Sequence, residues 1–249
     1  MASDETSGAP GGPIAGEPVQ HGTGVTSNRA FPTNSYPSSL DPFVLFERFY
    51  IEPGEGFPTH PHRGFEIVSY MLEGGMDHED SLGVTNTARE GEVMRITAGA
   101  GIRHSEFPAG DEGCNGLQLW LNLPRDRKEV DPDYEDAAAA ELPTEERDGA
   151  TVTTVVGEGS PIALHTPTEY LDVAVDGAWT WSLPDGWSGF LYGVSGEGTA
   201  DGAAFSEGDV LPVTDARSVE VRSDGDLRAV AVAGRPHGEP VRQRGPFVL

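Results

Sequence analysis

Two short strings in the first half of the chain carry residue types that bind metals. They are His60-Pro61-His62 and His104-Ser105-Glu106. Because successive side chains of a β-strand point to opposite faces, residues two apart share a face, and each string can aim two ligand groups at one point. Three imidazoles and a carboxylate form a mixed nitrogen and oxygen set, which suits iron, manganese, nickel, copper or zinc better than calcium or magnesium. The spacing therefore predicts one mononuclear metal site inside a β-barrel.

The sequence around these strings is typical of short strands joined by glycine-rich turns. Residues 65–72 are mostly β-branched or aromatic and are followed by the turn Glu73-Gly74-Gly75. Gly99-Ala100-Gly101 predicts the bend that delivers His104, and residues 117–123 form a further buried strand. Many short strands separated by glycine indicate an antiparallel sandwich or barrel.

We expect four segments along the chain. Residues 1–27 are rich in Gly, Pro, Ser and Glu, and we expect them to be disordered because such a composition cannot offset its ordering entropy. Residues 28–135 are expected to form the barrel with the metal site, and residues 136–149 an acidic linker with a short helix. Residues 150–249 are expected to form a second barrel. The predicted fold class is therefore all-β, with two tandem antiparallel barrels.

The second half repeats turns of the first half without its histidine pairs. Gly208-Asp209-Val210 echoes Gly91-Glu92-Val93, and each follows an earlier glycine turn at a similar distance, which indicates a degenerate internal repeat. His165 and His237 have no partner of ligand type two residues away. We therefore expect no metal in the second barrel.

Composition restricts the partners and the compartment. The chain has 16 basic and 41 acidic residues, a formal net charge of -25, so nucleic acids and acidic membranes are not expected as direct partners. Acidic residues spread along the whole chain favour a solvated surface of the halophilic kind. The single cysteine, Cys114, cannot form an internal disulfide, and no apolar run of about 18 residues occurs, so we expect a cytoplasmic protein. We also expect a monomer.

Several longer strings resemble known families. The spacing Gly54-x5-His60-x-His62-x3-Glu66 resembles the first conserved motif of the cupin superfamily, although the glycine that normally closes it comes one place late, at Gly74. The match to the second cupin motif is looser, since only Gly101-x2-His104 fits. More specific strings are similar to the pirin family and run from about residue 25 to residue 249; they are Leu40-Asp41-Pro42-Phe43, His60-Pro61-His62-Arg63-Gly64-Phe65-Glu66, His78-Glu79-Asp80, Thr97-Ala98-Gly99, Gly116-Leu117-Gln118-Leu119-Trp120 and Gly245-Pro246-Phe247-Val248.

The resemblance implies two cupin barrels with one metal, usually iron, in the N-terminal barrel. Carried over by position, the ligands would be His60, His62, His104 and Glu106, and Glu66, the usual carboxylate ligand of other cupins, would not bind the metal. Several pirins show quercetin dioxygenase activity and others act as regulatory partners. Pirins commonly continue into a helical tail, whereas this chain ends at Leu249.

The function we expect is an iron(II)-dependent dioxygenase of the quercetin 2,3-dioxygenase type. It would act on an aromatic, flavonol-like enol and O2, with Glu106 taking the hydroxyl proton as general base. Manganese, nickel, copper and zinc remain alternatives to iron. Candidate lining groups are Phe57, Phe65, Met94 and Trp120, residue types that more often serve as plain core.

Other functions and roles stay open at this point. The first alternative is a non-catalytic regulatory binding protein that responds to its metal or to redox state and has an unknown protein partner. A sugar-cupin isomerase is a third class. His78-Glu79-Asp80 fits either a polar network behind the metal or a solvated strand end. Cys114 could be either a redox reporter or an inert core residue. Arg63 could either contact an anion or form a surface ion pair.

Overall fold

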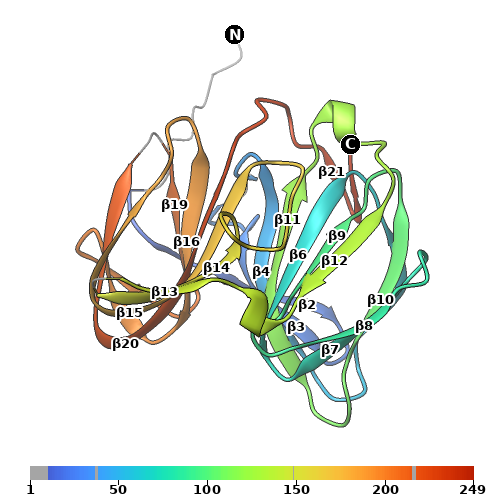
Figure 1. Cartoon of the computed structure of the whole chain (residues 1–249), viewed down its shortest axis with the longest axis horizontal. Helices are drawn as coiled ribbons and strands as arrows, with labels where there is room; N and C mark the ends of the chain where they lie inside the picture. Colours follow the sequence, from blue (N-terminus) through green and yellow to red (C-terminus); the bar gives the residue numbers. More distant parts are fainter. Residues whose placement is uncertain (1–10, 37–38, 148, 215–216) are drawn as a thin grey trace.

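Two β-barrels lie side by side in the computed structural model, which describes residues 11–36, 39–147, 149–214 and 217–249 (Figure 1). The strands of the first barrel form a seven-stranded and a four-stranded antiparallel sheet. They are β2 (Glu17–Gly22), β3 (Val25–Phe31), β4 (Phe43–Ile51), β5 (Phe57–His62), β6 (Phe65–Glu73), β7 (Gly75–Asp80), β8 (Thr85–Arg89), β9 (Val93–Thr97), β10 (Ile102–Pro108), β11 (Cys114–Asn122) and β12 (Asp133–Ala137).

The second barrel is a single nine-stranded antiparallel sheet that curls on itself. Its strands are β1 (Ile14–Ala15), β13 (Thr144–Arg147), β14 (Ala150–Val156), β15 (Thr168–Ser182), β16 (Ser188–Ser195), β17 (Glu197–Ala200), β18 (Ala203–Ser206), β19 (Asp209–Val213) and β20 (Ser218–Gly234). The remaining elements are the hairpin of β21 (Gln243–Arg244) and β22 (Phe247–Val248) and two 3-10 turns, η1 (Arg125–Arg127) and η2 (Ala139–Glu141). The predicted all-β class with two antiparallel barrels is confirmed.

The seven-stranded sheet separates two apolar cores. Along β6, Phe65 and Ile67 point into the first barrel, whereas Val68 and Tyr70 pack in a cluster shared with the second barrel. This alternation leaves β6 buried on both faces, which explains its nearly continuous apolar sequence.

Aromatic rings join the two barrels. Phe190 of the second barrel lies 5.0 Å from Phe31 and 4.8 Å from Phe46 of the first, measured between ring centroids. Tyr192 lies 5.1 Å from Phe46. Because both halves contribute these rings, a shared apolar cluster joins the barrels in addition to the clusters inside each of them.

Both ends of the described chain cross to the opposite barrel. β1 pairs with β19, so the N-terminal segment adds a strand to the second barrel. After β20, residues 235–249 leave the second barrel and run back over the first, as the red segment of Figure 1 shows. Arg63 and Phe247 form a parallel bridge where this segment reaches the first barrel. We call residues 243–249 the C-terminal strap.

The prediction of disorder for residues 1–27 is wrong for its second part, while residues 1–10 lie outside the described residues. β1, β2 and the start of β3 lie within residues 11–27. β2 pairs with β3, and Val25 is buried, so backbone pairing and one apolar anchor order a stretch whose composition alone suggested otherwise.

The segment 136–149, predicted as a linker with a short helix, contains η2, but it also carries strands. Residues up to Ala137 belong to β12, which pairs with β9 of the first barrel. β13 pairs with β14 of the second barrel. The segment thus contains the end of an edge strand of the first barrel and the whole edge strand β13 of the second, and residue 148 lies outside the described residues.

Candidate metal centre

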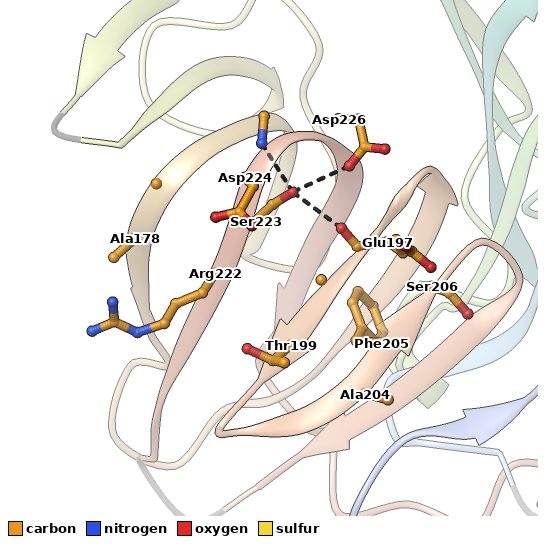
Figure 2. Close-up of a pocket in the computed structure, with 13 residues that line it drawn as sticks. Ala178, Glu197, Thr199, Ala204, Phe205, Ser206, Arg222, Ser223, Asp224 and Asp226 are labelled. Carbon is orange, nitrogen blue, oxygen red and sulfur yellow. Dashed lines mark hydrogen bonds between the residues drawn. The ribbon is translucent and has the colours of Figure 1, made fainter.

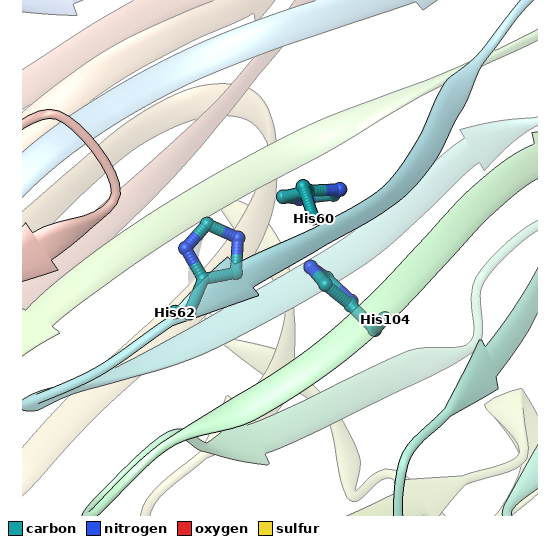
Figure 3. Close-up of side chains that lie close together, drawn as sticks. All are labelled: His60, His62 and His104. Atoms are coloured by element: carbon teal, nitrogen blue, oxygen red, sulfur yellow. The ribbon is translucent and has the colours of Figure 1, made fainter.

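Strands β5 and β10 bring the three predicted histidines together. The antiparallel register pairs His104 with His60, and His62 lies two residues further along β5 on the same face. Ring centroids are 4.4 Å apart for His60 and His104, 4.7 Å for His60 and His62, and 4.9 Å for His62 and His104. One ring nitrogen of each residue lies within 4.8 Å of those of the other two. Figure 3 shows the three rings converging from the two strands.

Backbone carbonyls orient two of the rings. His60 Nδ1 donates to the Pro58 carbonyl at 2.9 Å, and His62 Nδ1 donates to the Pro246 carbonyl at 3.3 Å. A ring whose Nδ1 is protonated and held in this way leaves Nε2 unprotonated, which is the state that binds a metal. The carbonyl that orients His62 comes from the C-terminal strap.

Burial keeps the inner two imidazoles neutral. His62 and His104 are almost fully buried, whereas His60 is partly exposed. Burial, with a smaller contribution from the neighbouring histidines, lowers the pKa of His62 to about 3 and that of His104 to about 2. Neutral rings are competent ligands at ordinary pH.

The donor atoms that remain unpaired fit a metal ion. Both ring nitrogens of His104 and one carboxylate oxygen of Glu106 are buried and lack a hydrogen-bond partner among the described residues. Leaving a buried polar group unpaired costs about 1–3 kcal/mol, so a group with several such atoms calls for a ligand. A divalent cation that accepts imidazole and carboxylate would satisfy them.

Glu106 is displaced from the three-histidine group. Glu106 is 2% exposed, and its carboxylate forms a second group with His78 and His104 whose ligand atoms also lie within 4.8 Å of one another. β10 keeps its alternation, so His104 and Glu106 share its buried face, but a register shift in the pairing with β5 sets Glu106 opposite Phe57. The four predicted ligands are thus split between two overlapping groups that share His104.

Sequence reasoning left His78 undecided, and the structure places it inside the barrel. His78 is 1% exposed and its Nε2 lies 3.1 Å from a carboxylate oxygen of Asp80, whose side chain is also fully buried. β7 pairs with β10, which sets His78 opposite Glu106 and Asp80 opposite His104. The spacing of His78 and Asp80, again two residues, is the sequence signal that could have indicated an inward-facing pair.

Glu66 faces away from the histidines. Its carboxylate accepts hydrogen bonds from the backbone and Nδ1 of His165 in the second half, at 3.0 and 2.9 Å, and from the Thr97 hydroxyl at 2.8 Å. The hydrogen bond that His165 donates to the Glu66 carboxylate raises the pKa of His165. Glu66 therefore stabilises the contact between the halves and does not approach the candidate ligands.

Three of the four predicted lining residues contact the histidines. Phe57 lies 5.9 Å from His60, and Phe65 and Trp120 each lie 5.2 Å from His62, between ring centroids. The fourth, Met94, packs in the apolar core that includes Phe57. The histidine cluster thus has an aromatic wall on the side of β6 and β11.

The C-terminal strap is fixed directly beside His62. The Val248 backbone donates to the Arg63 carbonyl at 3.0 Å, and Lys128 Nζ donates to the carbonyls of Gly64 and Val248, at 2.7 and 3.2 Å. Burial lowers the pKa of this lysine to about 8. Arg63 itself forms an exposed ion pair with Glu129.

The second barrel encloses an apolar core. Trp181 pairs with Val219 across β15 and β20, and Trp181, Leu183, Val219 and Val221 lie in one buried cluster. His165 and His237 instead bond to Glu66 and to Thr166.

An open pocket of about 940 Å³ lies far from the histidines, at the rim of the second barrel (Figure 2). The Ser223 hydroxyl in this pocket already has hydrogen-bond partners. It faces the Glu197 carbonyl and the Asp226 carboxylate as acceptors, and it accepts a hydrogen bond from the Gly225 amide. The polar groups there serve the local turn, so volume alone does not make this pocket a reactive site.

Family models match both halves of the chain. Residues 24–121 match the family described as Pirin, and residues 170–249 match the Pirin C-terminal cupin domain. Human Pirin is 42% identical over 232 residues, covering 85% of this chain and 77% of the human protein. The chain belongs to the pirin family. The predicted family is thereby confirmed.

Solved structures agree with this pirin assignment. A quercetin 2,3-dioxygenase from Acinetobacter baumannii has a TM-score of 0.85 and 25% identity, covering 95% of this chain and 82% of that one. A bacterial pirin from Escherichia coli in complex with nickel(II) has a TM-score of 0.73 and 25% identity, covering 89% and 95%. The histidine cluster and these neighbours support a divalent metal in this pirin, without fixing which metal.

The part of the chain that the structure describes has no helix with the length and apolar character needed to span a bilayer. Cys114 is buried, and burial raises the pKa of its thiol to about 12. A protonated, inaccessible thiol is unreactive, which favours the inert alternative for this residue.

Proposed function

We propose that this pirin is a metal-dependent dioxygenase that opens the ring of flavonol-like enols, as quercetin 2,3-dioxygenases do, with iron(II) as the metal. The observation that carries the proposal is the convergence of His60, His62 and His104 within 4.8 Å, beside the buried and partly unpaired carboxylate of Glu106. Manganese, nickel, copper and zinc also suit this donor set.

Three residues would bind the metal ion, and Glu106 would transfer a proton. The three imidazoles would hold the ion, which supplies Lewis acidity and redox capability when bound. Glu106 would accept the proton of the flavonol hydroxyl, since its free carboxylate oxygen lies inside the barrel and is shielded from water. The flavonol ring opens with incorporation of both atoms of O2, which gives a depside and releases carbon monoxide.

The aromatic wall would position the substrate. Phe65 and Trp120 lie against His62, and Phe57 lies against His60 at the partly exposed end of the cluster. A planar aromatic substrate entering past His60 would stack on these rings while its hydroxyl approached Glu106. The partners that follow are a small aromatic molecule and O2.

The test is turnover by the iron-loaded protein. Protein freed of metal, reloaded with iron(II) under argon and mixed with quercetin is given an oxygen pulse, and oxygen uptake, carbon monoxide and depside are measured. The proposal predicts one carbon monoxide per O2 consumed. No carbon monoxide and no depside from protein with a full complement of iron would contradict it.

Two variants connect turnover with named residues. His62→Ala is expected to lose metal and activity together. Glu106→Gln should keep the metal and lose about 10²–10⁴-fold in rate, the usual contribution of a general base. Glu79→Gln, an exposed change on β7, is the matched control and should leave turnover unchanged.

A second candidate is a regulatory binding protein whose surface responds to the metal or its redox state. The contact between His62 and the Pro246 carbonyl favours it, because a change at the metal would reach the exposed strap. Metal-dependent hydrogen exchange in residues 243–249 without any oxygen uptake would support this function over the dioxygenase. We also place the protein in the cytoplasm, consistent with its single buried thiol.

A further inference from the structure

Basic side chains gather in one cleft of this otherwise acidic protein. The cleft has a volume of about 580 Å³ and lies between the η1 turn and the hairpin of β21 and β22. It is lined by Asn122, Arg125, Lys128, residues 239–244 and Leu249. Four of these residues are cationic, namely Arg125, Lys128, Arg242 and Arg244, and among the lining residues only Glu239 has an acidic side chain. In a chain with 16 basic and 41 acidic residues, such a local excess of positive charge indicates a specific purpose.

The hairpin directs two of the guanidinium groups to the same side. β21 pairs with β22, and the Leu249 backbone donates to the Arg242 carbonyl at 2.9 Å, which extends the pairing by one residue. Because residues two apart on a strand share a face, Arg242 and Arg244 lie on one side of the hairpin. Both line the cleft and are exposed, so a ligand from solvent can reach them.

The opposite wall holds Arg125 and Lys128 in place. The Arg125 backbone donates to Glu239 Oε2 at 2.9 Å, which ties the segment before β21 to η1. Lys128 Nζ donates to two backbone carbonyls and to the Asn122 side chain. These three acceptors are uncharged, so they fix the position of the ammonium group without neutralising its charge.

The charges of the cleft lack partners within the protein. In the part of the chain that the structure describes, none of the four cationic side chains forms an ion pair with a carboxylate, whereas Arg147 pairs with Glu145 and Arg222 with Glu220. Glu239 offsets one of the four charges, and an excess remains even if Leu249 carries a terminal carboxylate. Like charges that line one cleft repel each other, and a bound anion would remove that repulsion.

We propose that this cleft binds a small molecule carrying two or more anionic groups, either phosphates or carboxylates. Arg242 and Arg244 contact it from the hairpin. Arg125 contacts it from the opposite wall, where the Lys128 ammonium adds charge. Guanidinium groups pair with both kinds of oxyanion through two parallel hydrogen bonds, and the volume is that of a site for a metabolite-sized molecule. The site shares no residue with the histidine cluster or Glu106, and it does not depend on the proposed dioxygenase activity.

Titration calorimetry of the full chain tests the site with two probes at a constant ionic strength set with KCl. Fructose 1,6-bisphosphate presents two phosphates, and tricarballylate presents three carboxylates. We expect one probe molecule to bind per chain, and the probe that binds more tightly identifies the anionic group. Arg242→Gln/Arg244→Gln should weaken this binding by about 100-fold, about 10-fold for each charged hydrogen-bonding group that is lost.

Arg89→Gln/Arg222→Gln is the matched control, because it removes two exposed arginines that lie outside the cleft. It should leave the affinity nearly unchanged, and circular dichroism establishes that both double variants are folded. The proposal is overturned if folded wild-type protein shows no saturable binding of either probe, or if the two double variants bind as tightly as each other.

Hydrogen exchange of the wild-type protein gives a readout that needs no variant. A saturating probe should slow exchange of the Val248 and Leu249 amides, because it bridges the hairpin and η1. Unchanged exchange of these amides at saturation would place the ligand elsewhere and would overturn the proposal.

Discussion

The contact between the C-terminal strap and His62 can be tested by adding one methyl group. Gly64 has φ +82°, and a Cβ at this position would lie 2.0 Å from the Val248 carbonyl oxygen, where ordinary contact begins at 3.4 Å. The strap therefore has to move in Gly64→Ala. Moving it displaces the Pro246 carbonyl, which orients the ring of His62.

Gly83→Ala is the matched control, because it introduces the same kind of backbone strain as Gly64→Ala without a steric clash. Gly83 has φ +85°, and nothing lies within 4 Å of its added Cβ. Both variants carry the left-handed penalty of about 1–2 kcal/mol. Only Gly64→Ala disturbs the metal centre, and loss of a group that orients a ligand typically lowers metal affinity by about 10–100-fold.

Competition with a chelator measures the Co(II) affinity of both variants, and thermal unfolding without metal measures their stability. We expect similar losses from the backbone in both, a further loss of stability in Gly64→Ala from the displaced strap, and weakened Co(II) binding in Gly64→Ala alone. Equal and unchanged Co(II) affinity in the two variants would refute the role of the strap in orienting His62.

Three further predictions concern the contact between the halves and the surface. Glu66 raises the pKa of His165 in the folded protein. The stability that this pair contributes is therefore greatest below about pH 6.5, the pKa of histidine in the unfolded chain, and is lost as pH rises through the higher pKa of the folded protein. Urea unfolding should therefore show a difference between wild type and His165→Gln that shrinks from about pH 6 to about pH 9, and a difference that grows would contradict this. Tyr70→Phe, which removes the hydrogen bond from Tyr70 to Asp172, should cost about 1 kcal/mol of unfolding free energy. Asp172→Ala should cost about 3–5 kcal/mol, near the lower end because its partner Arg228 is partly exposed, and an equal cost for the two variants in denaturant titrations would argue against the network. The acidic surface predicts that molar KCl raises the midpoint of thermal unfolding, because salt at 1 M screens repulsion between carboxylates that are more than about 3 Å apart. A midpoint independent of salt would exclude halophilic adaptation.

Spacing along a strand predicted that His60 and His62 share a face, because residues two apart point the same way. His104 joins them through the pairing of β10 with β5, which sets it opposite His60. Glu106 shares the buried face of β10 with His104, and the pairing of β10 with β7 sets it opposite His78. That placement depends on which strands pair, which periodicity alone does not encode.

Contacts between distant segments were the part that sequence could not supply. The Pro246 carbonyl reaches His62 across 184 positions of sequence, and β2 is ordered by pairing with β3 in spite of its loop-like composition. Both depend on backbone groups, which leave no trace in residue type. The repeated turns did predict the second barrel, which encloses a buried apolar cluster.

X-ray absorption of the bound metal tests the central claim most directly. Metal-free protein loaded with one equivalent of iron(II) should give a spectrum whose first shell contains only nitrogen and oxygen, with the multiple scattering of about three imidazoles at metal–nitrogen distances of about 2.0–2.1 Å. His62→Ala should lose part of that imidazole scattering. A spectrum without imidazole scattering, from protein that has retained its iron, would contradict the metal centre proposed for His60, His62 and His104.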